Sequence, residues 1–435
     1  MADEHPGAAP PEHPPTPKRY HELDSLRGCM MMLGIVLHAG VAYMQTPLGE
    51  LWPYKDSQTH FGFDVLVAFL HTFRMPVFFV MAGFFAALLY QQRGVRSMIR
   101  NRAQRVLIPL LVGWAVIFPL TVGGFAFAQL GGTAEAASAA IRYVFSLAVL
   151  EHLQLLHLWF LLDLLIYYAA ALLIGQLLSS VPHAAQRRLA DGFAWLLQRW
   201  YVPLVLAVPT ALTLAPMRSG ILETPGTFQR PFATLTADAI FFAFGWLLYV
   251  RREQLPSLSE HAWGRTLAGS ILFPLHGLAV VRLAEQPDRL AHTVAILSLA
   301  VMIWLLVFGL TGLFLRYLAG PSPFRRYLAD ASYWFYLVHL PMVAWGSGLL
   351  GHLPWPASVK CLVLLSIVVA VCWGTYDLAV RPTLVGVFLN GRRHPRGLPI
   401  LSSREPATGQ ARTAADRERP VILRLAPQRR RRPGG

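Results

Sequence analysis

Long apolar runs recur along nearly the whole chain and are separated by short polar stretches. Each run holds about 20 or more predominantly apolar residues, enough for a helix to cross the hydrocarbon core of a bilayer. The pattern therefore predicts an all-α polytopic integral membrane protein with about ten transmembrane helices. The expected spans are residues 26–46, 62–90, 104–130, 152–180, 199–217, 232–250, 262–283, 292–318, 326–350 and 357–380. The shorter stretch 138–150 could instead lie along the membrane interface.

Composition supports a membrane protein. Of the 435 residues, 55% are hydrophobic and only 14% are charged, whereas a soluble domain normally carries about 25% charged residues. The net charge of +15 would suit a nucleic-acid-binding protein, but its distribution has another explanation. With ten spans, 30 of the 38 Lys and Arg residues fall on one side of the membrane and 6 on the other. This asymmetry predicts that both termini lie in the cytoplasm.

The spans form a single expected domain, residues 20–390, between two polar tails. Residues 1–19 are Pro-rich, lack the separate apolar segment of a cleavable signal, and are expected to be a disordered cytoplasmic tail. Residues 391–435 form a second disordered tail, whose basic residues could dwell near anionic headgroups or simply be solvated. The three cysteines lack metal-ligand spacing and are interpreted as small buried hydrophobic residues: Cys29, Cys361 and Cys372.

Two ionisable residues inside the first apolar run are spaced so that they share one face of a helix. Arg27 and His38 are 11 residues apart, and 11 helical steps of 100° return to within about 20° of the start. Asp24 extends the same stripe. Because an ionisable group in a span is costly, it usually faces the bundle interior and has a function. A neutral imidazole accepts protons from hydroxyls, so His38 is the candidate general base; the alternative is a histidine bonded to a neighbouring helix.

The second span carries Asp64, His71 and Arg74 on one side, just before Pro76. Arg74 would lie near mid-membrane, where a permanently charged guanidinium needs a partner or a water-filled cavity. It could hold a thioester carbonyl, a carboxylate or a phosphate, or it could form a structural ion pair with Asp64 or Asp163. Pro76 removes a backbone hydrogen bond and could open space beside Arg74.

Two later spans contain further polar side chains. In the fourth, His152 and Asp163 are 11 residues apart and would share a helical face, with Trp159 at the expected outer interface. In the ninth, Ser332 and His339 are 7 residues apart and would also share a face.

A cluster of arginines lies between the second and third spans: Arg93, Arg96, Arg100, Arg102 and Arg105. On the predicted cytoplasmic side, such a cluster could bind the phosphates of a nucleotide carrier. The positive-inside distribution predicts similar clusters without any ligand, so both interpretations stay open.

Several of these segments together resemble the membrane acyltransferase family called acyltransferase type three. The family opens with Arg, ten residues and His in its first span, which is similar to YHELDSLRGCMMMLGIVLH at residues 20–38. The later motifs follow in the family's order: HTFRMPVFFVMAGFF at 71–85, RVLIP at 105–109, HLWFLL at 157–162 and SYWFYLVH at 332–339. Ala82 stands where many members have Ser. The likeness covers about residues 20–380.

The resemblance implies an O-acyltransferase of the bacterial inner membrane that has no bound cofactor. Cytoplasmic acyl-CoA would be the donor of a succinyl or acetyl group, and a hydroxyl of a periplasmic glucan or other glycan the acceptor. His38 would be the essential base or a transient acyl carrier, and Arg27 and Arg74 would position the thioester or its phosphates. Substrate-binding residues are expected to be Asp24, His71, Arg102, Arg105, His152, Trp159, Ser332 and His339.

Two other functions fit the same residues. Ionisable side chains inside spans are also ordinary in transporters and exporters, although the sequence has no convincing internal repeat. An acyltransferase that acts on a lipid or a small molecule is a further possibility.

Overall fold

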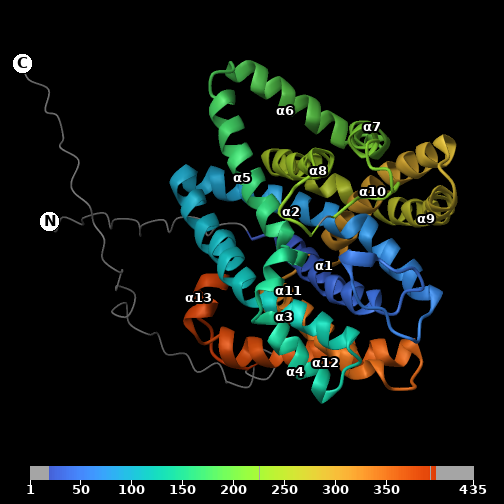
Figure 1. Cartoon of the computed structure of the whole chain (residues 1–435). Helices are drawn as coiled ribbons and strands as arrows, with labels where there is room; N and C mark the ends of the chain where they lie inside the picture. The colour runs from blue at the N-terminus through green and yellow to red at the C-terminus, as the bar shows by residue number, and fades with distance from the viewer. Residues whose placement is uncertain (1–18, 225, 392, 398–435) are drawn as a thin grey trace, which may run out of the picture.

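Helices form the fold, and no strand occurs among the described residues (Figure 1). The computed structural model describes residues 19–224, 226–391 and 393–397, without the side chain of His152, so most of the two expected tails lies outside the described residues. Within this part of the chain the α-helices are α1 (His21–Val41), α2 (Phe61–Arg102), α3 (Ile108–Gln129), α4 (Ala134–Val144), α5 (Trp159–Leu178), α6 (His183–Leu197), α7 (Val202–Leu214), α8 (Phe232–Val250), α9 (Ala262–Glu285), α10 (Arg289–Tyr317), α11 (Pro323–Gly351), α12 (Ala357–Thr375) and α13 (Leu384–Asn390).

Every predicted span contains an α-helix, which confirms the all-helical fold. Six segments of the described chain are long and apolar enough to cross a membrane: Phe61–Gln129, Leu147–Leu178, Phe232–Val250, Ala262–Glu285, Arg289–Tyr317 and Ala357–Val380. α1 and α11 are not among the six, and both carry polar side chains, such as His38 and His339, along their length. The number of crossings and the cytoplasmic position of the termini stay predictions.

Side-chain caps explain where several helices begin after the polar connections. The Thr133 hydroxyl accepts a hydrogen bond from the backbone N–H of Ala136 at the start of α4, and Asp288 accepts from Leu290 at the start of α10. Such caps satisfy N–H groups that have no partner inside the helix. Polar residues between the apolar runs therefore separate the spans and also start the next helix.

α2 continues to Arg102 instead of ending near residue 90, so most of the connection between the second and third expected spans is helical. Arg93, Arg96 and Arg100 lie on this helix, which has one break at Gly94, where φ is 72°. The length of the apolar run predicts how much of a helix can cross the membrane, but it does not predict where the helix ends. The helix can continue into the polar residues that follow, because arginine is a good helix former. Arg96 and Arg100 therefore lie on a helical segment that follows the break at Gly94.

The fourth span also differs from the prediction, because α5 begins at Trp159 and not near residue 152. The preceding residues form short 3-10 turns at Leu147–His152 and Leu156–Leu158. Leu156 has φ of 51°, and the N–H groups of Leu155 and Leu156 donate to the Gly226 carbonyl at 2.7 and 3.0 Å. A tertiary contact thus ends the helical path, and the predicted shared face of His152 and Asp163 is wrong.

α1 runs through the middle of the bundle and contacts α2, α10, α11 and α12 (Figure 1). α2 and α8 cross in backbone contact at two glycines. A Cβ atom added at Gly83 would lie 2.0 Å from the Phe242 carbonyl oxygen, and one added at Gly245 would lie 1.9 Å from that of Val80. Only residues without a side chain allow two membrane helices to approach this closely.

This crossing predicts that Gly83→Ala destabilises the protein. The new methyl group would meet the backbone of α8, which cannot move as a side chain can, so we expect a loss of about 1–3 kcal/mol in the free energy of unfolding. Thermal unfolding of the purified protein in detergent measures the effect. Gly277→Ala in α9 is the matched control, because nothing lies within 4 Å of its added Cβ. Equal unfolding temperatures for the two variants would contradict the tight crossing.

Candidate active site

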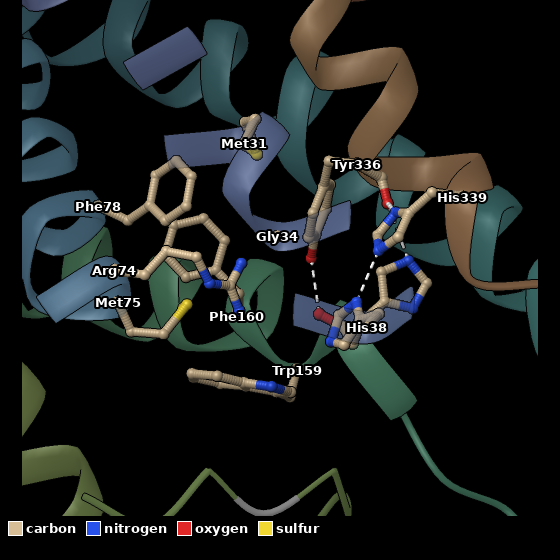
Figure 2. Close-up of a pocket in the computed structure, with 11 residues that line it drawn as sticks. Met31, Gly34, His38, Arg74, Met75, Phe78, Trp159, Phe160, Tyr336 and His339 are labelled. Carbon is tan, nitrogen blue, oxygen red and sulfur yellow. Dashed lines mark hydrogen bonds between the residues drawn. The ribbon is translucent and has the colours of Figure 1, made fainter. Parts of the chain in front are cut away.

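A cavity lies inside the bundle between α1, α2, α11 and the start of α5 (Figure 2). It holds about 430 Å³ of empty space, including the part open to the surroundings. Its lining consists of Met31, Gly34, His38, Arg74, Met75, Phe78, His157, Trp159, Phe160, Tyr336 and His339. Three imidazoles, one guanidinium and one phenol therefore meet in a wall that is otherwise mainly apolar. Figure 2 shows Arg74 and Met75 on one side of the cavity and His38 and His339 on the other.

The cavity brings together four of the residues that the sequence predicts for the site: His38, Arg74, Trp159 and His339. The strongest contact among them is a hydrogen bond between His38 Nδ1 and His339 Nε2, 2.7 Å long, which joins α1 to α11. The two imidazole rings are nearly parallel, with 10° between their planes.

The partners of His339 determine which nitrogen of His38 is free. His339 Nδ1 lies 2.9 Å from the carbonyl oxygens of both Phe335 and Tyr336. Because carbonyl oxygens only accept hydrogen bonds, this nitrogen carries the proton, and Nε2 of a neutral His339 is an acceptor. His38 Nδ1 must then donate to it. His38 Nε2 is left with a free lone pair, and no described residue forms a hydrogen bond with it.

His157 is held against α11 by a reciprocal pair of hydrogen bonds. Its Nε2 donates to the Tyr336 and Leu337 carbonyls at 3.0 and 3.3 Å, and the Tyr336 hydroxyl donates to the His157 carbonyl at 2.8 Å. Pro341 has no N–H for the Leu337 carbonyl four residues earlier, which leaves this acceptor available. Sequence reasoning did not place His157 or Tyr336 in the site, although the motifs HLWFLL and SYWFYLVH contain them.

Arg74 has no charge partner among the described residues, and its buried Nε makes no hydrogen bond there. The predicted alternative, in which Arg74 forms a structural ion pair with Asp64 or Asp163, is wrong. The Asp64 carboxylate accepts from the backbone N–H groups of residues 45 and 46, and Asp163 forms a bidentate pair with Arg230 at 2.6 and 2.7 Å. Both carboxylates are thus occupied elsewhere, and the guanidinium can bind an anion in the cavity.

The Arg74 guanidinium packs against the backbone of α1 at Gly34. A Cβ atom added at Gly34 would lie 2.6 Å from one terminal guanidinium nitrogen. Gly34 and His38 are four residues apart and therefore lie on the same face of α1, one turn from each other. Arg27, seven residues before Gly34, lies 5.7 Å from the Phe85 ring of α2. Arg27 and Gly34 therefore face α2, and His38 on the same stripe reaches His339 of α11.

Arg27 lies near the start of α1, away from the cavity, and belongs to a group that we call the arginine cluster: Arg27, Arg93, Arg102 and Arg105. Arg27, Arg93 and Arg102 all lie close to Arg105. Arg27 also forms an ion pair with Asp24 at 3.4 Å. The Arg102 guanidinium lies 4.5 Å above the Tyr168 ring. No carboxylate in the described part of the chain forms an ion pair with Arg102 or Arg105. The cluster therefore carries excess positive charge.

Tyr333 on α11 connects the arginine cluster to the cavity. Its hydroxyl donates to the Arg105 carbonyl at 2.7 Å, and its ring lies parallel to that of Tyr336, with the centroids 6.2 Å apart. Since Tyr336 lines the cavity, these two rings lie between the Arg105 backbone and the cavity.

Two other predicted residues are satisfied by backbone groups and do not line the cavity. His71 Nε2 donates to the Leu222 carbonyl at 2.7 Å, and the buried Ser332 hydroxyl donates to the Ala329 carbonyl at 2.8 Å. The side chain of His152 lies outside the described part of the structure. The cysteines are free thiols, with Cys361 and Cys372 buried and Cys29 half-buried.

Comparison with known proteins identifies the family. A family model described as an acyltransferase domain matches residues 20–377, which is most of the chain. Proteins named Glucans biosynthesis protein C from Salmonella paratyphi B, Salmonella schwarzengrund and Salmonella agona are 23% identical over 381 residues, covering 87% of this chain and 96% of theirs. No solved structure gives a significant match. The chain therefore belongs to the type three family of acyltransferases and is an acyl-transferring enzyme.

Proposed function

We propose that this membrane enzyme transfers an acyl group from cytoplasmic acyl-CoA to a hydroxyl group of an extracytoplasmic glucan or other glycan, across the bacterial inner membrane. The observation that carries the proposal is the hydrogen-bonded pair of His38 and His339, which leaves His38 Nε2 free in the same cavity as the unpartnered Arg74. A free base beside an unpaired cation is what attack by a hydroxyl on a thioester requires. The name of the Salmonella relatives supports a glucan as the acceptor.

The side chains of the cavity account for each step of the transfer. The acceptor oxygen attacks the thioester carbonyl carbon while its proton passes to His38 Nε2. Arg74 stabilises the negative charge that develops on the carbonyl oxygen. The carbon–sulfur bond then breaks, and the leaving thiolate takes the proton from His38, which yields an ester and free CoA. Attack by His38 Nε2 itself would form an acyl-histidine instead, and the same lone pair serves that route.

The arginine cluster supports CoA as the donor. The guanidinium groups of Arg102 and Arg105, which form no ion pair in the described chain, suit the phosphates of a nucleotide carrier. The rings of Tyr333 and Tyr336 lie between the Arg105 backbone and the cavity. The positive-inside distribution of the loops favours a cytoplasmic position for this end of the bundle. A succinyl group would add a free carboxylate that needs a cation, whereas an acetyl group would not.

The proposal predicts that membranes containing the protein release free CoA thiol from succinyl-CoA or acetyl-CoA when a β-glucan is supplied. His38→Ala should lower this release by about 100-fold or more, because general-base catalysis contributes a factor of about 10²–10⁴. His352→Ala, which changes an exposed histidine at the end of α11, is the matched control and should retain activity.

The assay measures the release of CoA and the molecule that receives the acyl group, and each measurement can contradict the proposal. If folded wild-type protein releases no CoA from either donor, the carrier is not CoA. If CoA is released but the acyl group is recovered on lipid, the acceptor is not a glucan.

The role of His339 predicts different effects for two substitutions. His339→Leu removes the acceptor that orients His38, so we expect kcat to fall by about 100-fold with little change in KM. His339→Gln keeps an amide oxygen that can accept from His38 Nδ1 and should recover at least tenfold of that loss. Steady-state kinetics of both variants measures the difference. Equal activities for the leucine and glutamine variants would show that His339 does not orient His38 through their hydrogen bond.

The contact between Arg74 and Gly34 predicts a loss of activity without a loss of stability. The methyl group of Gly34→Ala would displace the end of the Arg74 side chain, and a shift of about 1 Å at a catalytic group can lower the rate about 100-fold. We expect a fall in kcat at an unchanged unfolding temperature, because a flexible side chain can move. Gly277→Ala again serves as the control. Full activity of Gly34→Ala would show that the position of Arg74 does not matter.

A further inference from the structure

The connection between α1 and α2, residues 42–60, covers the end of α1 that carries His38. Trp52 in this connection is 8% exposed, and its ring is nearly parallel to that of His38, with the centroids 5.9 Å apart and 19° between the planes. The Trp52 ring also packs edge-on against Phe125 of α3, with the centroids 4.9 Å apart. An indole therefore lies directly beside the candidate base.

Strong contacts fix the position of this connection. The Asp56 carboxylate forms a fully buried ion pair with Lys360 of α12 at 2.9 Å. The Asp56 N–H donates to the Ala42 carbonyl at 2.8 Å, and Gln129 donates to the Pro53 carbonyl at 2.8 Å. Because Pro53 and Asp56, which follow Trp52 closely, are anchored to α3 and α12, the backbone that carries the indole is held beside His38.

The indole N–H of Trp52 is buried and has no hydrogen-bond partner among the described residues. Leaving a buried donor unpaired is costly, so such groups are rare in folded proteins. By contrast, the indole N–H groups of Trp114 and Trp345 donate to backbone carbonyls at 2.8 and 2.9 Å. The fold thus holds an unsatisfied donor beside the base of the proposed reaction.

The position of Trp52 favours the acceptor over the donor as its ligand. The arginine cluster, where the phosphates of the donor would bind, includes Arg27 near the start of α1, whereas Trp52 covers the opposite end of that helix. A polyhydroxylated acceptor brings several oxygens close to the hydroxyl that reacts. One of these oxygens can accept the free N–H.

We propose that Trp52 is an acceptor-binding residue, whose indole N–H donates a hydrogen bond to an oxygen of a sugar acceptor and so directs the reacting hydroxyl toward His38 Nε2. This inference rests on the proposed function. It adds a group that recognises the acceptor, separate from the groups that activate it.

The test compares wild type with Trp52→Phe, which keeps an aromatic ring and loses the N–H. In initial-rate measurements with a β-glucan and acyl-CoA, we expect KM for the glucan to rise about tenfold while KM for the donor stays the same. Glucan binding measured by calorimetry without any donor should weaken by a similar factor. Trp345→Phe is the matched control, because its N–H bonds to the protein, and it should leave both constants unchanged.

Unchanged glucan affinity in Trp52→Phe, or an equal rise in KM for the donor, would overturn the proposal. If Trp52→Phe fails to fold, benzothienylalanine at position 52 removes the N–H at nearly constant shape and gives the same readout. The binding measurement needs no CoA, so it separates a failure of this inference from a failure of the proposed donor. Wild-type protein that binds no glucan rules out both the glucan acceptor and this role of Trp52.

Discussion

The hydrogen bond between His38 and His339 determines the chemistry of the cavity. Two backbone carbonyls of α11 require a proton on His339 Nδ1, and this requirement passes through His339 to His38. The helix backbone therefore sets the protonation pattern of a base on another helix. This arrangement leaves a lone pair on His38 Nε2, and the other polar groups of the cavity are placed around it.

Arg74 differs from the charged groups inside the bundle that form ion pairs. Asp163 with Arg230, and Asp56 with Lys360, form ion pairs whose side chains are almost fully buried. Such pairs neutralise each other and hold elements together, although removal from water offsets much of their attraction. Arg74 has no such partner in the described chain. A cation left unpaired in this setting is stabilised only when an anion arrives, which is the behaviour expected of a binding group.

The sequence predicts well whatever depends on local patterns. Hydrophobic length predicted an α-helix in each of the ten expected segments, and the eleven-residue spacing placed Arg27 and His38 on one stripe of α1. The same arguments failed where a tertiary contact decides the outcome. The start of α5 was misplaced because Gly226 binds the turn before Trp159, and the assumed partners of Arg74 bind other groups. The pairing of His38 with His339 could not be predicted, since no period relates positions on different helices.

The bond between His38 and His339 joins residues 301 positions apart, and the pair of Asp56 with Lys360 joins residues 304 apart. Proteins are synthesised from the N-terminus, so α1 and its connection to α2 are made long before their partners exist. Until α11 and α12 have been inserted, His38 lacks its partner His339, and the connection that covers it lacks the buried ion pair with Lys360. Activity therefore arises only when the nearly complete chain has been assembled in the membrane, and a prematurely terminated chain would carry an incomplete and inactive site.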